Sequence, residues 1–245
     1  MTGDVWDERD AASYDEGAAD MFAPEVLGPT VDFLAGLAPG GRALEFAVGT
    51  GRVAVPLRER GLSVAGIELS VPMADAMRAK PAAAGIEVVV GDMATATIGE
   101  PGEFDLVYVV YNSISNVLVQ AEQVAVFRNA ARHLRPGGRF VIELWVPDLR
   151  RLPPGALGQP FHLSENYVAL DTYDLLHQQV VSHHYHVDEG RAGVFRSRHR
   201  FIWPSELDLM GELAGLRLAE RWADWKRAEF TADSRSHVSV WVKGG

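Results

Sequence analysis

The chain contains no cysteine among its 245 residues. Disulfide bonds, thiolate nucleophiles and zinc sites built on cysteine are therefore excluded. It also lacks any apolar run close to the roughly 20 residues that a membrane-spanning helix needs. The first ten residues, MTGDVWDERD, are polar and acidic, unlike a secretory signal peptide. We therefore expect a cytoplasmic protein without a membrane partner.

Basic residues are in short supply. The chain has 23 Lys and Arg residues and 33 Asp and Glu residues, which gives a formal net charge of −10. Proteins that bind nucleic acids or anionic membrane surfaces carry a basic patch, so we expect neither partner here. Hydrophobic residues make up 47% and charged residues 23% of the chain, an ordinary globular composition. The length favours one large α/β domain with a small added element.

Short apolar runs alternate with helical patterns over the first part of the chain. Buried strands are expected at 42–48, 62–69, 86–92, 104–112 and 139–146. Helices are expected from 25 to the Pro-Gly-Gly at 39–41, and at 51–61, 70–85 and 120–134. This alternation is typical of βαβ units, and near-continuous apolar strands are typical of a sheet covered on both faces. The sequence therefore predicts a doubly wound parallel sheet.

The alternation stops after residue 146. A proline-rich stretch follows, and residues 168–203 are rich in β-branched and aromatic side chains. We interpret them as an antiparallel meander of two or three strands with a turn at residues 188–190. A helix from Pro204 and two closing strands, 216–225 and 236–243, complete the chain. The expected division is a core of residues 1–147 and 204–245, and an insertion of residues 148–203.

A glycine pair, Gly49 and Gly51, follows the first expected strand and precedes a helix. Such a turn lets the backbone approach a ligand, and the helix N-terminus attracts negative charge. Gly49-x-Gly51-x-x-Ala54 also matches a dinucleotide fingerprint. Glu68 lies 17 residues beyond Gly51, at the end of the second strand, where its carboxylate can accept hydrogen bonds from both ribose hydroxyls. Both features fit more than one nucleotide-like cofactor.

Other polar residues follow the third and fourth expected strands. Ligands of open α/β sheets bind at the carboxyl ends of the strands, so these residues are candidates for the site. Asp92 can accept a hydrogen bond from an adenine amine, and Met93 can cover the face of the ring. We expect the segment VVYNSISN, residues 109–116, to lie beneath the reactive group of the bound ligand.

Together these segments resemble the class I S-adenosylmethionine (SAM)-dependent methyltransferases over most of residues 43–146. The matching motifs, in family order and spacing, are 45–52 (EFAVGTGR), 66–73 (GIELSVPM), 91–93 (GDM) and 134–138 (LRPGG). The resemblance implies a Rossmann-like α/β fold with a seven-stranded sheet whose last strand is antiparallel. It also implies that Glu45 and the glycine turn hold the methionyl end of SAM, with Glu68 on the ribose. Ala47 departs from the family, which commonly has glycine there, and we expect a tighter turn.

The resemblance also suggests that Tyr14, in the segment AASYDEG, closes over the cofactor; the alternative is an aromatic residue that only packs. The cofactor is SAM and its product is S-adenosylhomocysteine (SAH). The expected cofactor-binding residues are Tyr14, Glu45, Ala47, Gly49, Gly51, Arg52, Glu68, Leu69, Met73, Gly91, Asp92, Met93 and Tyr111.

The meander and the C-terminal segment look similar to methyltransferases that act on amino sugars and secondary metabolites, in which inserted strands roof the active site. The expected reaction is in-line transfer of a methyl group to a nitrogen or oxygen atom of a small molecule. The catalytic candidates are Tyr111, Asn112 and His183. The candidates for binding the acceptor are Ser113, Asn116, Tyr185, Arg198 and Trp225.

The meander is rich in histidines, a residue type that often binds metals. We nevertheless expect no metal site there. His183, His184 and His186 lie on one expected strand, where alternation splits them between opposite faces. His183 and Tyr185 share one face and His184 and His186 the other, and either face can look inward.

Two other functions stay open at this level. One is an NAD-dependent reductase, which the glycine turn and Glu68 also allow. The acidic Glu45, the Gly-Asp-Met tripeptide at 91–93 and the lack of a Tyr-x-x-x-Lys pair count against it. The other is a catalytically inactive SAM-binding protein, because fold alone does not imply function. The one assembly that we consider beyond the monomer is a homodimer.

Overall fold

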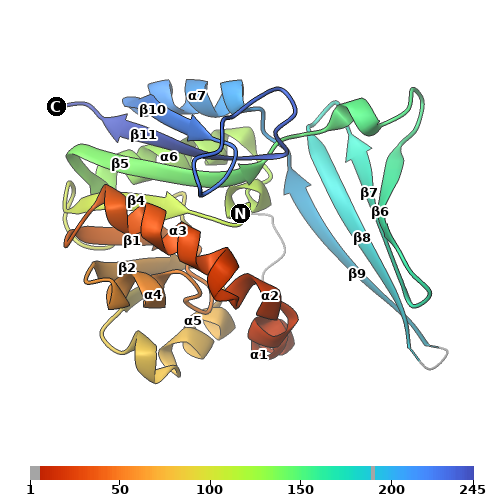
Figure 1. Cartoon of the computed structure of the whole chain (residues 1–245), viewed down its shortest axis with the longest axis horizontal. Coiled ribbons are helices and arrows are strands. Elements are labelled where there is room, and N and C mark those ends of the chain that lie inside the picture. Colours follow the sequence, from red (N-terminus) through yellow and green to blue (C-terminus); the bar gives the residue numbers. More distant parts are fainter. Residues whose placement is uncertain (1–5, 189–190) are drawn as a thin grey trace.

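The computed structural model describes residues 6–188 and 191–245. Seven strands form a central sheet in the order β10-β11-β5-β4-β1-β2-β3 (Figure 1). Its strands are β1 (Arg42–Phe46), β2 (Ser63–Glu68), β3 (Glu87–Val90), β4 (Phe104–Val109), β5 (Leu134–Trp145), β10 (Leu216–Trp222) and β11 (Ser236–Lys243). β11 runs antiparallel to both of its neighbours, while β1 to β5 pair in parallel. The predicted seven-stranded sheet with an antiparallel last strand is confirmed.

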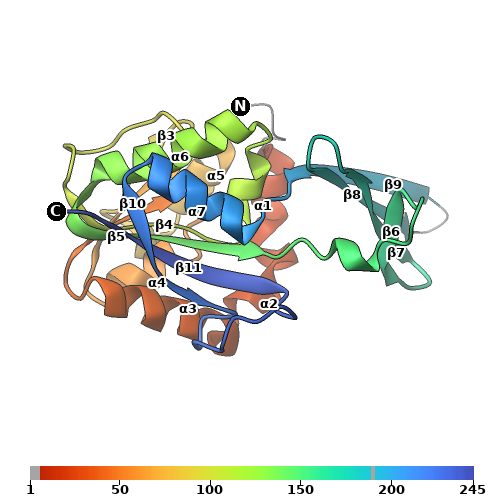
Figure 2. The same ribbon diagram turned by 90° about the horizontal axis from the view of Figure 1, so that it is seen from above.

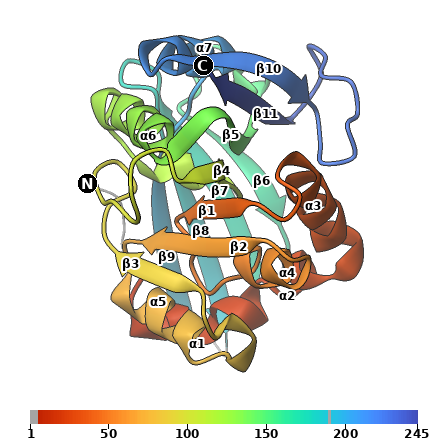
Figure 3. The same cartoon turned by 90° about the vertical axis from the view of Figure 1, so that its left-hand side faces the viewer.

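Helices cover both faces of this sheet, as Figure 3 shows. The helices are α3 (Pro24–Leu37), α4 (Ala54–Glu59), α5 (Val71–Arg78), α6 (Gln120–His133) and α7 (Pro204–Leu213). On one face Leu34 of α3 and Leu57 of α4 pack with Val141 of β5. On the other face Phe127 of α6 packs edge-on to Phe140 of β5, with 5.1 Å between ring centroids. The strands are apolar on both sides because each side is buried under helices.

A second sheet of four antiparallel strands lies to one side of this core (Figure 2). Its strands are β6 (Gly158–Leu163), β7 (Tyr167–Asp174), β8 (Gln179–Asp188) and β9 (Arg191–Arg200). Three of them, β7 to β9, confirm the antiparallel meander predicted over residues 168–203. The fourth strand, β6, was not predicted, because it begins in the proline-rich stretch. Pro160 is tolerated there since β6 is an edge strand with a register shift between Pro160 and His162. Of the predicted turn, residues 189 and 190 lie outside the described residues.

Arg200 anchors this small sheet, which we call the insert sheet, to the core. Its side chain is 4% exposed and donates hydrogen bonds to Gln123 of α6 at 2.6 Å and to Glu206 of α7 at 2.6 Å. A third bond, at 2.9 Å, goes to the amide oxygen of Gln178 between β7 and β8. These bonds fix one face of the insert sheet, the inner face, toward the carboxyl ends of the core strands.

Two N-terminal helices, α1 (Glu8–Gly17) and α2 (Ala19–Phe22), lie beside the same end of the core sheet (Figure 1). Asp15 of α1 accepts a hydrogen bond from the hydroxyl of Thr50 at 2.6 Å and pairs with Lys80 at 2.5 Å. The carbonyl of Trp6 accepts a bond from the hydroxyl of Ser70 at 2.6 Å. The N-terminal segment is thus tied to the loops that follow β1 and β2. Among the described residues no helix is long and apolar enough to cross a bilayer.

Candidate active site

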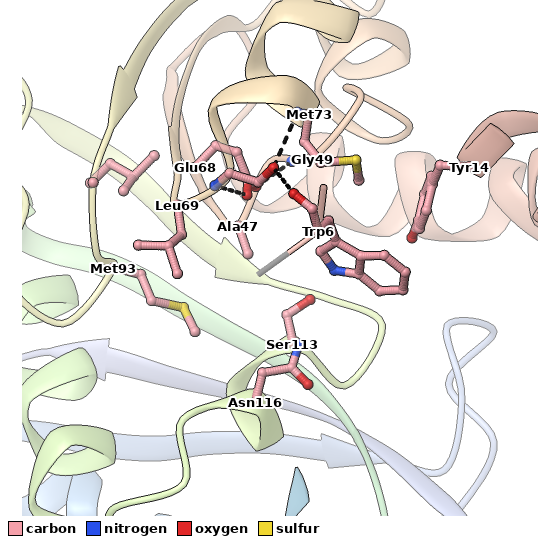
Figure 4. Close-up of a pocket in the computed structure, with 13 residues that line it drawn as sticks. Trp6, Tyr14, Ala47, Gly49, Glu68, Leu69, Met73, Met93, Ser113 and Asn116 are labelled. Atoms are coloured by element: carbon pink, nitrogen blue, oxygen red, sulfur yellow. Dashed lines mark hydrogen bonds between the residues drawn. The ribbon is translucent and has the colours of Figure 1, made fainter. Parts of the chain in front are cut away.

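A cavity lies at the carboxyl ends of β1, β2 and β3, where the topology places ligands (Figure 4). We call it the cofactor cavity. Its lining comes from the N-terminal segment, the loops after these strands and the loop after β4. The lining residues are Trp6, Tyr14, Ala47, Gly49, Ile67, Glu68, Leu69, Ser70, Met73, Gly91, Met93, Ser113 and Asn116. Eight of the thirteen residues expected to bind a cofactor are therefore brought together here.

The turn after β1 needs left-handed backbone at three positions. Ala47 has a φ of 55°, Gly49 of 57° and Gly51 of 84°. Glycine adopts this conformation freely, whereas alanine is strained in it by roughly 1–2 kcal/mol. A side chain at Gly51 would also approach Cγ of Met77 to 3.0 Å. The sequence could foresee the glycines, but it could not show that Ala47 carries the strain.

Glu68 is held by two backbone N–H groups. Gly49 donates to one carboxylate oxygen and Ser70 to the other, each at 2.8 Å. The residue is 6% exposed, and burial raises the pKa of its carboxyl while the two N–H donors oppose the rise. Each oxygen keeps a lone pair that can accept a further hydrogen bond. The carboxylate is therefore fixed in place with both oxygens able to accept bonds from a diol.

Glu45 does not line the cofactor cavity. Its carboxyl is buried beneath the turn and accepts a hydrogen bond from the hydroxyl of Tyr108 at 2.9 Å. Burial raises its pKa from 4.5 to about 8, although Tyr108 and the nearby Arg52 favour the charged form. Glu45 therefore supports the turn from below. Its direct contact with the methionyl group of SAM stays a prediction.

Gly51, Arg52, Asp92 and Tyr111 also lie outside the lining of the cofactor cavity. The guanidinium of Arg52 stacks over the ring of Tyr111, 5.3 Å from its centroid. A carboxylate oxygen of Asp92 accepts a hydrogen bond from the N–H of Ala94 at 2.8 Å. Their contacts with a cofactor stay predictions.

A second cavity, of about 680 Å³, adjoins the first. We call it the acceptor cavity. It shares four residues with the cofactor cavity and is completed by the loop after β4 and the inner face of the insert sheet. Its lining residues are Trp6, Tyr14, Gly17, Ala18, Tyr111, Asn112, Ser113, Ser115, Asn116, His184, His186, Phe195, Ser197 and His199. Four predicted catalytic or acceptor-binding residues, Tyr111, Asn112, Ser113 and Asn116, are brought together.

The loop after β4 enters this cavity in a strained conformation. Tyr111 and Asn112 have consecutive left-handed φ values of 53° and 62°. Glu143 of β5 accepts a hydrogen bond from the N–H of Tyr111 at 2.7 Å, and the amide oxygen of Asn112 accepts one from the N–H of Trp145 at 2.8 Å. Backbone strain that neighbouring bonds maintain is characteristic of functional sites.

The inner face of the insert sheet carries His184 and His186, whereas His183 lies on the outer face. His183 accepts a bond from Arg196 at 3.2 Å and is 2.9 Å from the hydroxyl of Thr172. The ring of Tyr185 stacks on that of His183, and Arg198 alternates to the same outer face. The structure does not bring His183, Tyr185 or Arg198 to the cavity, since the strand period of two places them on the opposite side.

Trp225 is also away from the acceptor cavity. Its indole N–H donates to Glu143 at 2.7 Å, and its ring packs against Phe33 of α3 with 5.5 Å between centroids. Through Glu143 it supports the backbone of Tyr111, so its effect on the cavity is indirect.

Sequence reasoning missed His199 and Trp6. Nδ1 of His199 lies 2.9 Å from the amide oxygen of Asn116, and Nε2 lies 2.9 Å from the hydroxyl of Ser197. Alternation along a strand allows His199 to lie on either face of the sheet, so the sequence does not select it. Trp6 stacks on Phe195 of the insert sheet with 6.3 Å between centroids, a contact that no local pattern indicates.

Comparisons with known proteins identify the family of the chain. Residues 43–138 match a family model described as a methyltransferase domain. The chain is 37% identical to the CcbJ methyltransferase from Streptomyces caelestis, with 98% of each chain covered and a TM-score of 0.85. It is 26% identical to the cypemycin N-terminal methyltransferase of a Streptomyces species over 94% of this chain and 98% of the relative. It is also 36% identical to dTDP-4-amino-2,3,4,6-tetradeoxy-D-glucose N,N-dimethyltransferase from Saccharopolyspora spinosa, over 43% of this chain and 41% of the relative.

Solved structures with the same fold have been determined with SAM or SAH bound. The cofactor is SAM, and the reductase alternative is set aside. The chain belongs to the SAM-dependent methyltransferases.

Proposed function

We propose that the protein transfers a methyl group from SAM to the nitrogen of a small amine in secondary metabolism. The observation that carries this proposal is the continuity of the two cavities, which share Trp6, Tyr14, Ser113 and Asn116. An acceptor bound in one cavity can therefore reach the methyl group of a cofactor bound in the other. The insert sheet forms one wall of the acceptor cavity, an arrangement that favours a small acceptor over a nucleic acid.

Nitrogen is favoured over oxygen by the relatives and by the chemistry. Two of the named relatives are an N-terminal methyltransferase and an N,N-dimethyltransferase, and their names state that they methylate nitrogen. A neutral amine attacks the sulfonium methyl group directly, whereas an alcohol must first lose its proton to a strong base. The acceptor cavity offers histidines, which are suited to taking a proton from an ammonium near neutral pH.

The residues of the cofactor cavity fit SAM. The fixed carboxylate of Glu68 can accept bonds from both ribose hydroxyls. Apolar side chains of Ile67, Leu69 and Met93 offer contact surface to the adenine ring. Gly49 has a φ of 57° and no Cβ, so the backbone of the turn can approach the methionyl end closely.

SAM supplies a methyl group that is already activated by its sulfonium. The chain has to align the amine with that group and to exclude water, and such preorganisation contributes up to roughly 7–11 kcal/mol. Ser113 and Asn116, at the junction of the cavities, are placed to orient the acceptor. We assign the role of base to His199 in place of His183. The amide oxygen of Asn116 only accepts, so Nδ1 of His199 carries the hydrogen and Nε2 is the basic nitrogen, which accepts a hydrogen bond from the hydroxyl of Ser197 until it takes the proton.

The test is a calorimetric titration with SAH and, separately, with NADH. We expect SAH to bind, and binding of NADH without SAH would refute the proposed function. Release of SAH from SAM is then followed with a panel of small primary amines and matched alcohols. Turnover with amines is expected, and turnover confined to alcohols would exclude nitrogen as the acceptor atom.

Glu68→Ala tests the site directly. We expect it to weaken SAH binding by ~2 kcal/mol, because charge-assisted hydrogen bonds to the ribose are lost. Glu59→Ala, which removes an exposed carboxylate at the end of α4, is the matched control. Equal affinities of the two variants in calorimetry would show that Glu68 does not hold the ribose.

A further inference from the structure

A third cavity, of about 500 Å³, continues from the acceptor cavity along the inner face of the insert sheet. We call it the distal chamber. Asn112, Ser115 and His199 line both spaces, so the two are contiguous. The wall of the distal chamber on the insert sheet carries Asp171 and Tyr173 of β7 and Val180 and Ser182 of β8. An acceptor longer than a single sugar ring would extend into it from the site of methyl transfer.

Asp171 gives this chamber its chemical character. The hydroxyl of Ser182 donates to one carboxylate oxygen at 2.6 Å, and the hydroxyl of Tyr173 donates to the other at 3.4 Å. Burial and the charge of Asp171 raise the pKa of Tyr173 to about 12, so the phenol keeps its proton and donates. Both partners are neutral. Within the described part of the chain, no Lys or Arg nitrogen forms an ion pair with Asp171, so its negative charge stays uncompensated.

The other acidic residue of the chamber is already neutralised. Asp148 pairs with Arg150 at 3.2 Å and with Arg151 at 3.0 Å. Two basic residues also line the chamber: Arg151, whose charge is paired with Asp148, and Arg235, which is exposed to solvent. Among the described residues, Asp171 is therefore the acidic residue of the chamber that has no Lys or Arg partner, and its carboxylate lies between two hydroxyl groups and the apolar side chain of Val180.

We propose that the distal chamber binds a second ammonium group of the methyl acceptor and that Asp171 determines this specificity. This inference rests on the proposed function and names the class of its substrate, a small molecule with at least two amino groups. A carboxylate with free lone pairs binds an ammonium through a charge-assisted hydrogen bond, which is about twice as strong as a neutral one. A nucleoside diphosphate would place like charge beside Asp171, so nucleotide-linked amino sugars are disfavoured. The net charge of −10 disfavours them further.

Three commercially available probes test the proposal by calorimetry on the SAH-bound protein. Neamine carries several amino groups on two rings, glucosamine carries one amino group, and UDP-glucosamine carries one amino group and a diphosphate. We expect neamine to bind more tightly than glucosamine, and UDP-glucosamine to bind more weakly than both. Equal or tighter binding of UDP-glucosamine, or no advantage of neamine over glucosamine, overturns the proposal with the wild-type protein alone.

Asp171→Asn then assigns the effect to its residue. The amide keeps the shape of the side chain and can still accept a bond from Ser182. Loss of the charge should weaken neamine binding about tenfold or more and leave glucosamine binding unchanged. Asp174→Asn is the matched control, because Asp174 lies at the exposed end of the same strand, is bonded to His177, and lines none of the three cavities. An equal loss for both probes, or an equal loss in both variants, contradicts the assignment. Failure of every protein to bind SAH would refute the proposed function instead.

Discussion

The buried carboxyl of Glu45 should make the protein lose stability as the pH rises through the neutral range. The group is buried beneath the glycine turn, and burial raises its pKa from 4.5 to about 8. It is therefore neutral in the folded protein at pH 7 and ionised in the unfolded chain. A group whose pKa is raised by folding contributes its full stabilisation below the unfolded value, and this is lost as pH rises to the folded value.

Glu45→Gln removes the titration while keeping the shape and the acceptor for Tyr108. Between pH 4.5 and pH 8 the wild type should lose about 1.4 kcal/mol of unfolding free energy per pH unit relative to the variant. From pH 5 to pH 8 the relative loss amounts to ~3.5 kcal/mol, and above pH 8 it levels off. Other titrating groups are common to both proteins, so they cancel in the difference.

Urea unfolding followed by circular dichroism at pH 5, 6.5 and 8 measures the difference. Glu59→Gln, an exposed substitution on α4, should show no pH-dependent difference from the wild type. A free-energy difference between Glu45→Gln and the wild type that is constant over this range would refute the reasoning. It would mean that Glu45 is ionised in the fold and is stabilised by Arg52 and Tyr108 more strongly than burial opposes it.

Three further substitutions have expected outcomes. Ala47→Gly relieves the left-handed strain and should raise the unfolding free energy by ~0.5–1 kcal/mol, measured by urea unfolding; a decrease would show that Ala47 packs favourably. Arg200→Met leaves the carboxylate of Glu206 without its cation and should cost ~3 kcal/mol in the same assay, whereas an unchanged midpoint would refute its role as an anchor. His199→Asn should lower kcat by roughly 10²–10⁴-fold and flatten the acidic limb of the pH profile. The exposed His177→Asn should leave both unchanged, and equal profiles of the two variants would exclude His199 as base.

The core of the fold could be predicted because its signals are local. Each strand of the parallel sheet is a continuous apolar run, and the helices that follow have residues nearby that favour a helix start or end. Ser70 is an example, since its hydroxyl accepts the N–H of Met73 as expected of an N-cap. Glu68 was also predictable in position, because its distance from the glycine turn follows from one βαβ unit.

The acceptor side could not be predicted in the same way. His183 and His184 are adjacent, and period-two alternation separates them without telling which one faces inward. That choice depends on the anchoring of the insert sheet by Arg200, a contact between segments far apart in the chain. The edge strand β6 was missed because proline argues against a central strand, and only tertiary pairing with β7 reveals it.

The N-terminal segment has a consequence for how the two ligands bind. Trp6 and Tyr14 are walls of both the cofactor cavity and the acceptor cavity. Their rings contact each other edge-on, with 5.6 Å between centroids. A ligand that displaces one ring therefore changes the packing of the other. Any ligand that orders this aromatic pair changes the free energy of binding in the neighbouring cavity. Thermodynamic linkage makes this effect mutual: whatever factor SAM contributes to the affinity for the amine, the amine contributes to the affinity for SAM.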